Sequence, residues 1–162
     1  MKFSVDIVNE VGNRRCQNLT RLFCRKIFTA LLKEPKFKFL KNYREIGISV
    51  ILASNAKSRK LNYKHRGLDR ATNVLSFPLF SNTRGIKKAR QNLINLGDIV
   101  IAPAAVKSEA ASSNMSFYSQ FFWVLSHGIL HTLGLDHERS RKERERVEFI
   151  EKRLRRKVLR AR

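Results

Sequence analysis

The chain has 162 residues, 43% of them hydrophobic and 29% charged, which suits a single domain spanning residues 1–162 with its own core. No apolar run approaches the roughly 20 residues that span a bilayer, and MKFSVDIVNE lacks the features of a secretory signal, so we expect a cytoplasmic protein with no membrane partner. The 34 Lys and Arg against 13 Asp and Glu give a net charge of +21, which favours nucleic acid, RNA in particular, over the alternative of a merely solvated basic surface.

The hydrophobic pattern alternates with a period of two in some segments and recurs at helical spacing in others. It predicts strands at residues 3–8, 46–52, 72–79 and 96–102. It predicts helices at residues 15–32, 54–63, 103–111, 117–135 and 139–160, the fourth broken at Gly134. We expect a basic connector at 36–45, a turn-rich loop at 65–71 and a polar, basic loop at 81–96.

These elements indicate an α+β fold, a small mixed four-stranded sheet covered by about five helices. Cys16 and Cys24 lie too far apart on one helix to form a disulfide, so we expect reduced, buried thiols. Aromatic residues 121–123 are expected in the core, with stacking on RNA bases as the alternative for one of them.

The last predicted helix combines an apolar stripe with many basic side chains. Its stripe has helical spacing and should face the body of the protein. Its end, RLRRKVLRAR, is a candidate RNA-contact surface; the alternative is a solvated helix whose arginines complement the helix dipole. The stripe consists of Val147, Ile150, Leu154 and Val158.

Three of the four histidines fall within eleven residues, in the segment HGILHTLGLDH. His127 and His131 are four apart and share a helix face, so their imidazoles can reach one metal ion. Gly134 can end the helix and let the chain return His137 as a third ligand. Three nitrogen ligands leave one tetrahedral position open, as in catalytic zinc sites. We therefore predict a zinc site at the end of this central helix, although imidazole also suits nickel, copper and iron.

The spacing also matches a class of zinc metalloproteases, H-E-x-x-H-x-x-G-x-x-H. In these peptidases the glutamate is the general base that activates zinc-bound water. Gly128 occupies that position here, which argues against peptide hydrolysis by this route.

Three segments together resemble the YbeY family of metal-dependent bacterial endoribonucleases that mature rRNA. HGILHTLGLDH is similar to the family signature H-G-x-L-H-L-x-G-Y-D-H. LNYKHRGLDRATNVLSFP is similar to the family block L-N-x-x-Y-R-x-x-D-x-P-T-D/N-V-L-S-F-P, and LGDIVIA to the strand L-G-D-I-V-I-S. The segments keep the family's order over residues 61–137.

The resemblance implies a mixed, mainly four-stranded sheet with several helices. It implies that His127, His131 and His137 bind a metal, usually taken as zinc, and that Arg66 is a functional residue. A guanidinium there would meet the negative charge that develops on phosphate oxygens during RNA cleavage. We assign catalytic roles to Arg66 and His127.

The chain departs from the family pattern at Leu135 (usually Tyr), Ala71 (usually Pro) and His65 (often Tyr). None is a predicted ligand, although His65, beside Arg66, could reach phosphate or the metal pocket. Several further polar residues have open roles. Asp136 either shapes the turn or orients a ligand, Asp98 is either structural or functional, and a strand beneath the pocket would present Thr72, Asn73 and Ser76.

The sequence supports three functions. The first is a single-strand-specific, metal-dependent endoribonuclease of rRNA maturation, including the small-subunit 3′ end, and of ribosome quality control. Its partners would be rRNA and the small subunit or its proteins. The second is a ribosome-assembly RNA-binding factor with a structural metal. The third is a metalloprotease-like hydrolase.

Overall fold

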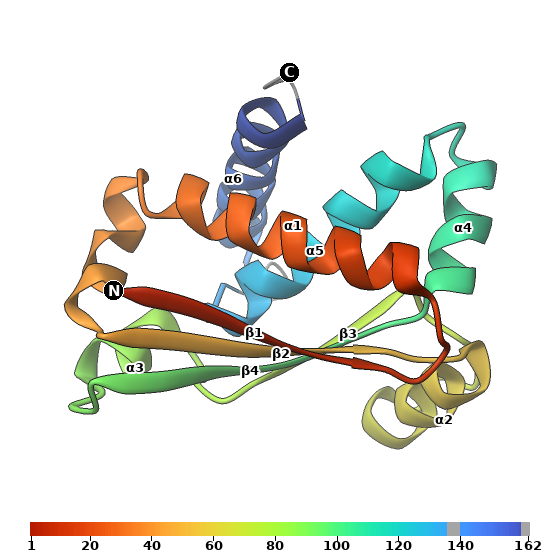
Figure 1. Ribbon diagram of the computed structural model, residues 1–162, viewed down its shortest axis with the longest axis horizontal. Helices are drawn as coiled ribbons and strands as arrows, with labels where there is room; N and C mark the ends of the chain where they lie inside the picture. Colours follow the sequence, from red (N-terminus) through yellow and green to blue (C-terminus); the bar gives the residue numbers. More distant parts are fainter. Residues whose placement is uncertain (136–139, 160–162) are drawn as a thin grey trace.

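A mixed four-stranded sheet organises the part of the chain that this computed structural model describes, residues 1–135 and 140–159 (Figure 1). The strand order is β1-β2-β4-β3; β1, β2 and β4 run parallel, and β3 runs antiparallel to β4. The predicted mixed sheet is confirmed. The strands are β1 (Lys2–Asn9), β2 (Glu45–Leu52), β3 (Val74–Pro78) and β4 (Leu93–Ile101).

The described residues form six α-helices and one 3-10 helix, more than the five helices predicted. The five predicted helices are present, with ends shifted by a few residues where those ends are described. The helices are α1 (Arg14–Leu31), α2 (Asn55–Arg66), α3 (Thr83–Lys88), α4 (Pro103–Ser112), α5 (Phe117–Thr132), α6 (Arg141–Leu159) and the 3-10 helix η1 (Pro35–Asn42).

The two missed helices are short; η1 lies in the predicted basic connector and α3 in the predicted polar, basic loop. In η1, Phe37 and Leu40 are buried three residues apart, which suits the three-residue turn of a 3-10 helix. In α3, the Asn82 side chain accepts a hydrogen bond from the Gly85 N–H and caps the helix, and Ile86 is fully buried. One or two buried residues are too few to produce a recognisable hydrophobic period.

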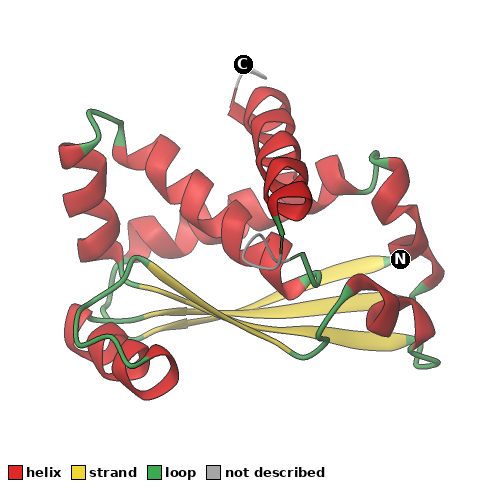
Figure 2. Cartoon of the chain, turned by 180° about the vertical axis from the view of Figure 1, so that it is seen from behind, coloured by secondary structure: helices red, strands yellow, loops and turns green. Residues whose placement is uncertain are grey.

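The helices form a thick layer on one face of the sheet (Figures 1 and 2). There, α1 and α5 pack against the strands, and α6 packs on α1 and α5. The opposite face is covered at one end by α2, over a small cluster that includes Leu75 and Val100. This arrangement makes α5 the central helix, as predicted.

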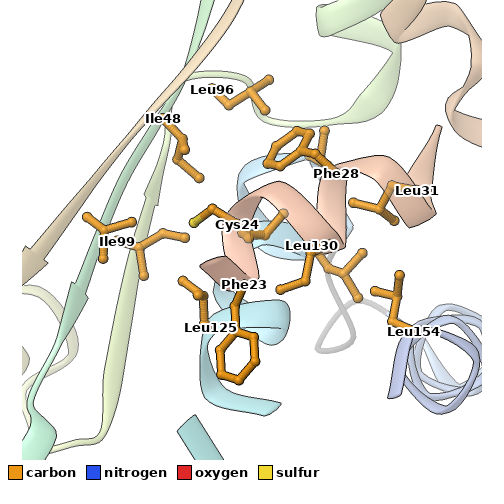
Figure 3. Close-up of a cluster of buried hydrophobic side chains, with 14 of the residues drawn as sticks. Phe23, Cys24, Phe28, Leu31, Ile48, Leu96, Ile99, Leu125, Leu130 and Leu154 are labelled. Carbon is orange, nitrogen blue, oxygen red and sulfur yellow. The ribbon is translucent and has the colours of Figure 1, made fainter. Parts of the chain in front are cut away.

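The main core lies between the sheet and this helix layer (Figure 3). Phe23 and Phe28 of α1, Ile99 of β4 and Leu130 of α5 meet there. Cys16 and Cys24 are buried free thiols, as predicted. Burial raises the pKa of Cys24 to about 12, so this thiol is unreactive at neutral pH.

The apolar stripe of α6 is buried as predicted, at residues 147, 150, 154 and 158. Glu34, which follows α1, accepts contacts from two cations of α6: Arg153 at 3.2 Å and Lys157 at 2.7 Å. This link fixes the C-terminal half of α6 against α1. Within residues 1–135 and 140–159, no helix has the length and apolar character to cross a membrane.

Candidate active site

His127 and His131 lie on one face of α5, and their Nε2 atoms are 3.1 Å apart. Ser116 starts this helix by accepting a hydrogen bond from the Ser119 N–H, and Gly134, at φ +75°, ends it. The four-residue spacing therefore brings the two imidazoles together, as predicted from the sequence.

Glu151 of α6 holds the other side of His127, with Oε1 2.8 Å from Nδ1. A carboxylate can only accept, so Nδ1–H of His127 donates this bond. With Nδ1–H bonded to Glu151, Nε2 is the ring nitrogen that faces His131 and can bind a metal. Glu151 is 8% exposed and is the only charged residue buried within the described residues. Sequence reasoning missed this residue.

The two imidazoles fit a zinc ion. Two nitrogen ligands of a tetrahedral zinc, each about 2.05 Å from the metal, lie about 3.3 Å apart, close to the observed separation. A carboxylate on the far nitrogen of a ligating histidine is a usual feature of such sites.

His137 and Asp136 lie outside the described residues. Among described residues, no group of three His, Cys, Asp or Glu side chains is close enough to hold a metal, so the predicted three-histidine ligand set stays a prediction.

The C-terminal end of α5 is held by α3, which sequence reasoning had assigned to a loop. The Thr83 hydroxyl donates a hydrogen bond to the Leu133 carbonyl at 3.0 Å. A Cβ on Gly134 would come within 2.5 Å of backbone atoms of Asn82. Gly134 is therefore required for its positive φ and for this close approach.

Gly128 faces the sheet. A Cβ at this position would lie 2.9 Å from Ile99 Cγ2 and 3.3 Å from Ser76 Oγ. The metalloprotease glutamate would therefore collide with β3 and β4 on this backbone. This geometry strengthens the argument against the peptidase mechanism.

A cavity of about 380 Å³ opens beside the two histidines and also contains Arg66. The cavity thus brings together three of the four predicted site residues. Larger cavities exist, such as one of about 680 Å³ between β1 and α1, but this one contains no histidine or carboxylate. The described residues lining the active-site cavity are His65, Arg66, Thr72, Asn73, Val74, Leu75, Ser76, Phe77, Glu109, Trp123, His127 and His131.

Arg66 and His65 form the end of α2, where we had predicted a loop. Gly67, at φ +70°, caps the helix one residue later than Arg66. The following loop is braced against α2, because Arg59 forms two hydrogen bonds to Asp69, at 2.6 and 2.7 Å. Arg66 is therefore presented by the end of a helix, next to a loop that is tethered to the same helix.

Comparisons with known proteins give the family of this chain. The family described as "Endoribonuclease YbeY" matches residues 9–158. This chain belongs to the YbeY family. A relative from Thermodesulfovibrio yellowstonii, named "Endoribonuclease YbeY", is 35% identical over 95% of this chain and 96% of its own. Another from Acetivibrio thermocellus, with the same name, is 38% identical over 80% and 83%.

The solution structure of a Thermotoga maritima protein has a similar fold. Its TM-score is 0.56 at 24% identity, over 94% of this chain and 89% of that one. This likeness supports the α+β fold expected of a YbeY protein and says nothing of the chemistry.

The remaining predicted residues divide between cavity and surface. Thr72, Asn73 and Ser76 line the cavity as proposed, and His65 reaches it too, with its ring 5.0 Å from that of Phe77. Asp98 is exposed on β4 and lies outside the residues that line the cavity, which favours the structural role.

The structure also shows the surroundings of two residues that depart from the YbeY pattern. Leu135 is buried in the main core, so the residue that replaces the usual Tyr serves packing. Ala71 is half-buried in the braced loop after α2.

Trp123 is not a core residue, whereas Phe121 and Phe122 are buried as predicted. Trp123 is 36% exposed, lines the cavity and lies 5.5 Å from the His127 ring in a stacked arrangement. The prediction failed because all three residues are equally apolar, and only the helix rotation decides which one faces the cavity. Helical spacing was the available signal, since Trp123, His127 and His131 are successively four apart.

Proposed function

We propose that this chain is a zinc-dependent endoribonuclease that cleaves single-stranded RNA. Its role would lie in rRNA maturation, including the small-subunit 3′ end, and in ribosome quality control. The observation that carries the proposal is the shared cavity of His127, His131 and Arg66 in a chain of charge +21. The name of the relatives gives the reaction class.

His127 and His131, with His137 as the predicted third ligand, would hold the zinc ion. When bound, zinc supplies Lewis-acid polarisation of a phosphate oxygen and lowers the pKa of a coordinated water. Glu151 keeps Nε2 of His127 directed at His131. Imidazole nitrogens are common zinc ligands, so the His127 and His131 pair supports zinc as the metal.

Arg66 would bind the non-bridging oxygens of the phosphate that is cleaved. Its planar guanidinium offers a fork of donors matched to two oxygens, and its interaction strengthens as negative charge develops there. Its position at a braced helix end limits the motion that a loop arginine would have, which favours a positioned catalytic group.

The proposal is tested by cleavage of a single-stranded rRNA fragment. We expect His127→Ala and Arg66→Glu to lose at least a hundredfold in rate. Lys64→Glu is a matched control, since it makes the same charge change on α2 at an exposed residue that does not line the cavity. Equal rates in all four proteins would mean that a contaminating nuclease cleaves the RNA.

The basic face of α6 favours a second role, as a ribosome-assembly factor that binds rRNA. This reading predicts that His127→Ala still binds and complements, while charge reversals on α6 fail. Under either role we propose a cytoplasmic protein whose partners are rRNA and the small subunit or its proteins. Its two buried, free thiols suit a reducing compartment.

A further inference from the structure

We propose that the cavity contains a nucleobase subsite, formed by Trp123, Asn73 and Glu109, that prefers bases bearing an exocyclic amino group over uracil. This proposal rests on the proposed function, because its ligand is RNA. It concerns the base of the nucleotide, whereas Arg66 and the histidines bind the phosphate. It assigns roles to three residues that the metal and phosphate chemistry leaves unused.

Trp123 supplies a stacking surface beside the catalytic residues: one face of its ring lies against the His127 ring, and a base would stack on the other face. It is 36% exposed, although its neighbours Phe121 and Phe122 are fully buried. It lies one helical turn before His127, about 6 Å along the axis of α5. A base on this ring would therefore belong to a nucleotide adjoining the phosphate at His127 and Arg66. Unstacked bases of single-stranded RNA are commonly held by aromatic side chains in this way.

Glu109 places a carboxylate in a cavity that we propose binds phosphate, and the phosphate chemistry does not explain it. Among the described lining residues it is the only carboxylate, and it shares the cavity with Arg66 and three histidines. A carboxylate repels phosphate, so its natural contact with RNA is an N–H or O–H donor. It is also not grouped with His127 and His131 as a metal ligand within the described residues.

The Glu109 side chain is fixed in place before any ligand binds. It projects from the last turn of α4 and accepts a hydrogen bond from the side-chain amide of Asn73, the residue just before β3. Asn73 keeps its amide oxygen and a second N–H for a ligand. The pair therefore presents acceptors together with one donor, in the same cavity as the exposed ring of Trp123.

This set of groups discriminates among bases by their edges. A carboxylate accepts from the amino group of cytosine, and equally from that of adenine or guanine. Uracil has no amino group and offers the carboxylate only its single N3–H, which is flanked on both sides by carbonyl oxygens that repel it. Leaving such groups unpaired is the usual source of discrimination between similar ligands.

Trp123 provides the readout, because it is the only tryptophan in the chain. We would titrate zinc-free protein with CMP and with UMP and follow tryptophan fluorescence. Both nucleotides carry the same phosphate, so the difference between them isolates the base. We expect saturable quenching by both, with CMP binding about tenfold more tightly. In Glu109→Gln the ratio should fall to about one, because an amide also donates to a uracil carbonyl.

Glu148→Gln is the matched control, since it removes an exposed carboxylate of α6 and should leave the ratio unchanged. Circular dichroism checks the fold of each variant. If Glu109→Gln does not fold, Asn73→Ala replaces it, because it frees Glu109 and should also reduce the ratio. Equal affinity for CMP and UMP in the wild type, or an unchanged ratio in the folded variant, overturns the subsite.

Cleavage of two oligonucleotides that differ only by cytosine or uracil beside the scissile phosphate separates this proposal from the nuclease proposal. Base-selective quenching without cleavage would support the subsite and contradict the nuclease. Cleavage with no base preference would overturn the subsite alone. If Glu109→Gln slowed both substrates equally, Glu109 would act on the attacking water instead of the base, and the subsite would again be overturned.

Discussion

His127 is the residue on which the candidate site depends most, because it joins α5, α6 and the cavity. Its Nδ1–H is held by Glu151, its Nε2 faces His131, and its ring stacks with Trp123. A side chain held on three sides has lost its rotamer freedom before a ligand arrives. A metal ion would therefore bind without a large ordering cost.

Replacing Glu151 should weaken zinc binding. In Glu151→Leu, the His127 ring loses its orienting acceptor, so we expect zinc affinity to fall by about 10- to 100-fold. The substitution also leaves the partly buried Nδ1–H of His127 without its acceptor, so we expect a loss of stability of about 1–3 kcal/mol as well. Competition with a chelating dye measures the affinity, and thermal unfolding of the zinc-free protein checks the fold. Unchanged affinity would show that Glu151 serves only α6 packing.

Arg66→Lys should separate phosphate recognition from metal binding. Lysine keeps the charge but loses the planar fork, so we expect kcat/KM on single-stranded RNA to fall at least tenfold. Zinc content, measured by elemental analysis, should stay at the wild-type level because Arg66 is not a predicted ligand. Normal kcat/KM would mean that only the charge at residue 66 matters.

Single site residues could be predicted from the sequence where their geometry depends only on neighbours in the chain. The spacing of His127 and His131 fixes their common face, and the family resemblance selected Arg66 from 34 basic residues. Glu151 was not predicted, because its contact depends on how α6 packs across α5. Its position within the apolar stripe, four residues after Val147, was the available signal.

The element that positions the site is α5, which is anchored along its length and at its end. Gly128 lets it approach β4 closely, and Gly134 lets its end meet α3. The helix itself could be predicted from its apolar content. Its support by α3 could not, because a six-residue polar helix with one buried residue has no period to detect.

Gly128→Ala should destabilise the fold. The new methyl group would lie 2.9 Å from Ile99 Cγ2, closer than real Cβ contacts, so we expect a cost of about 2–3 kcal/mol, which outweighs a gain in helix propensity of about 1 kcal/mol. We expect Tm to fall by about 2–6 °C in differential scanning calorimetry. Gly85→Ala is the control, because its Cβ would make ordinary contacts at 3.7 Å and should not lower Tm. An unchanged Tm in Gly128→Ala would mean that α5 can move away from the sheet.

The whole molecule is strongly basic, and α6 contributes nine exposed Lys and Arg against four Glu, a net +5 of the +21. The sequence predicted both the apolar stripe of α6 and its basic face. It could not tell whether that face contacts RNA, because a net charge states a preference for polyanions without locating the contact.

RNA affinity should depend on salt, and α6 should contribute to that dependence. Arg155 and Arg156 are exposed. If both contact phosphate, the double substitution to Gln should weaken binding and reduce the slope of log K against log salt by about 1.4. Fluorescence anisotropy with a labelled single-stranded RNA at several salt concentrations measures this slope. Weaker binding with an unchanged slope would place the RNA elsewhere.

The central claim is that a metal held by the α5 histidines makes this chain a nuclease. The most direct measurement adds zinc stepwise to chelated protein and follows bound zinc and RNA cleavage in the same samples. We predict that cleavage rises in proportion to bound zinc and saturates at one zinc per chain, and that His127→Ala shows neither. Full cleavage by the zinc-free protein, or stoichiometric zinc binding by His127→Ala, would contradict the account.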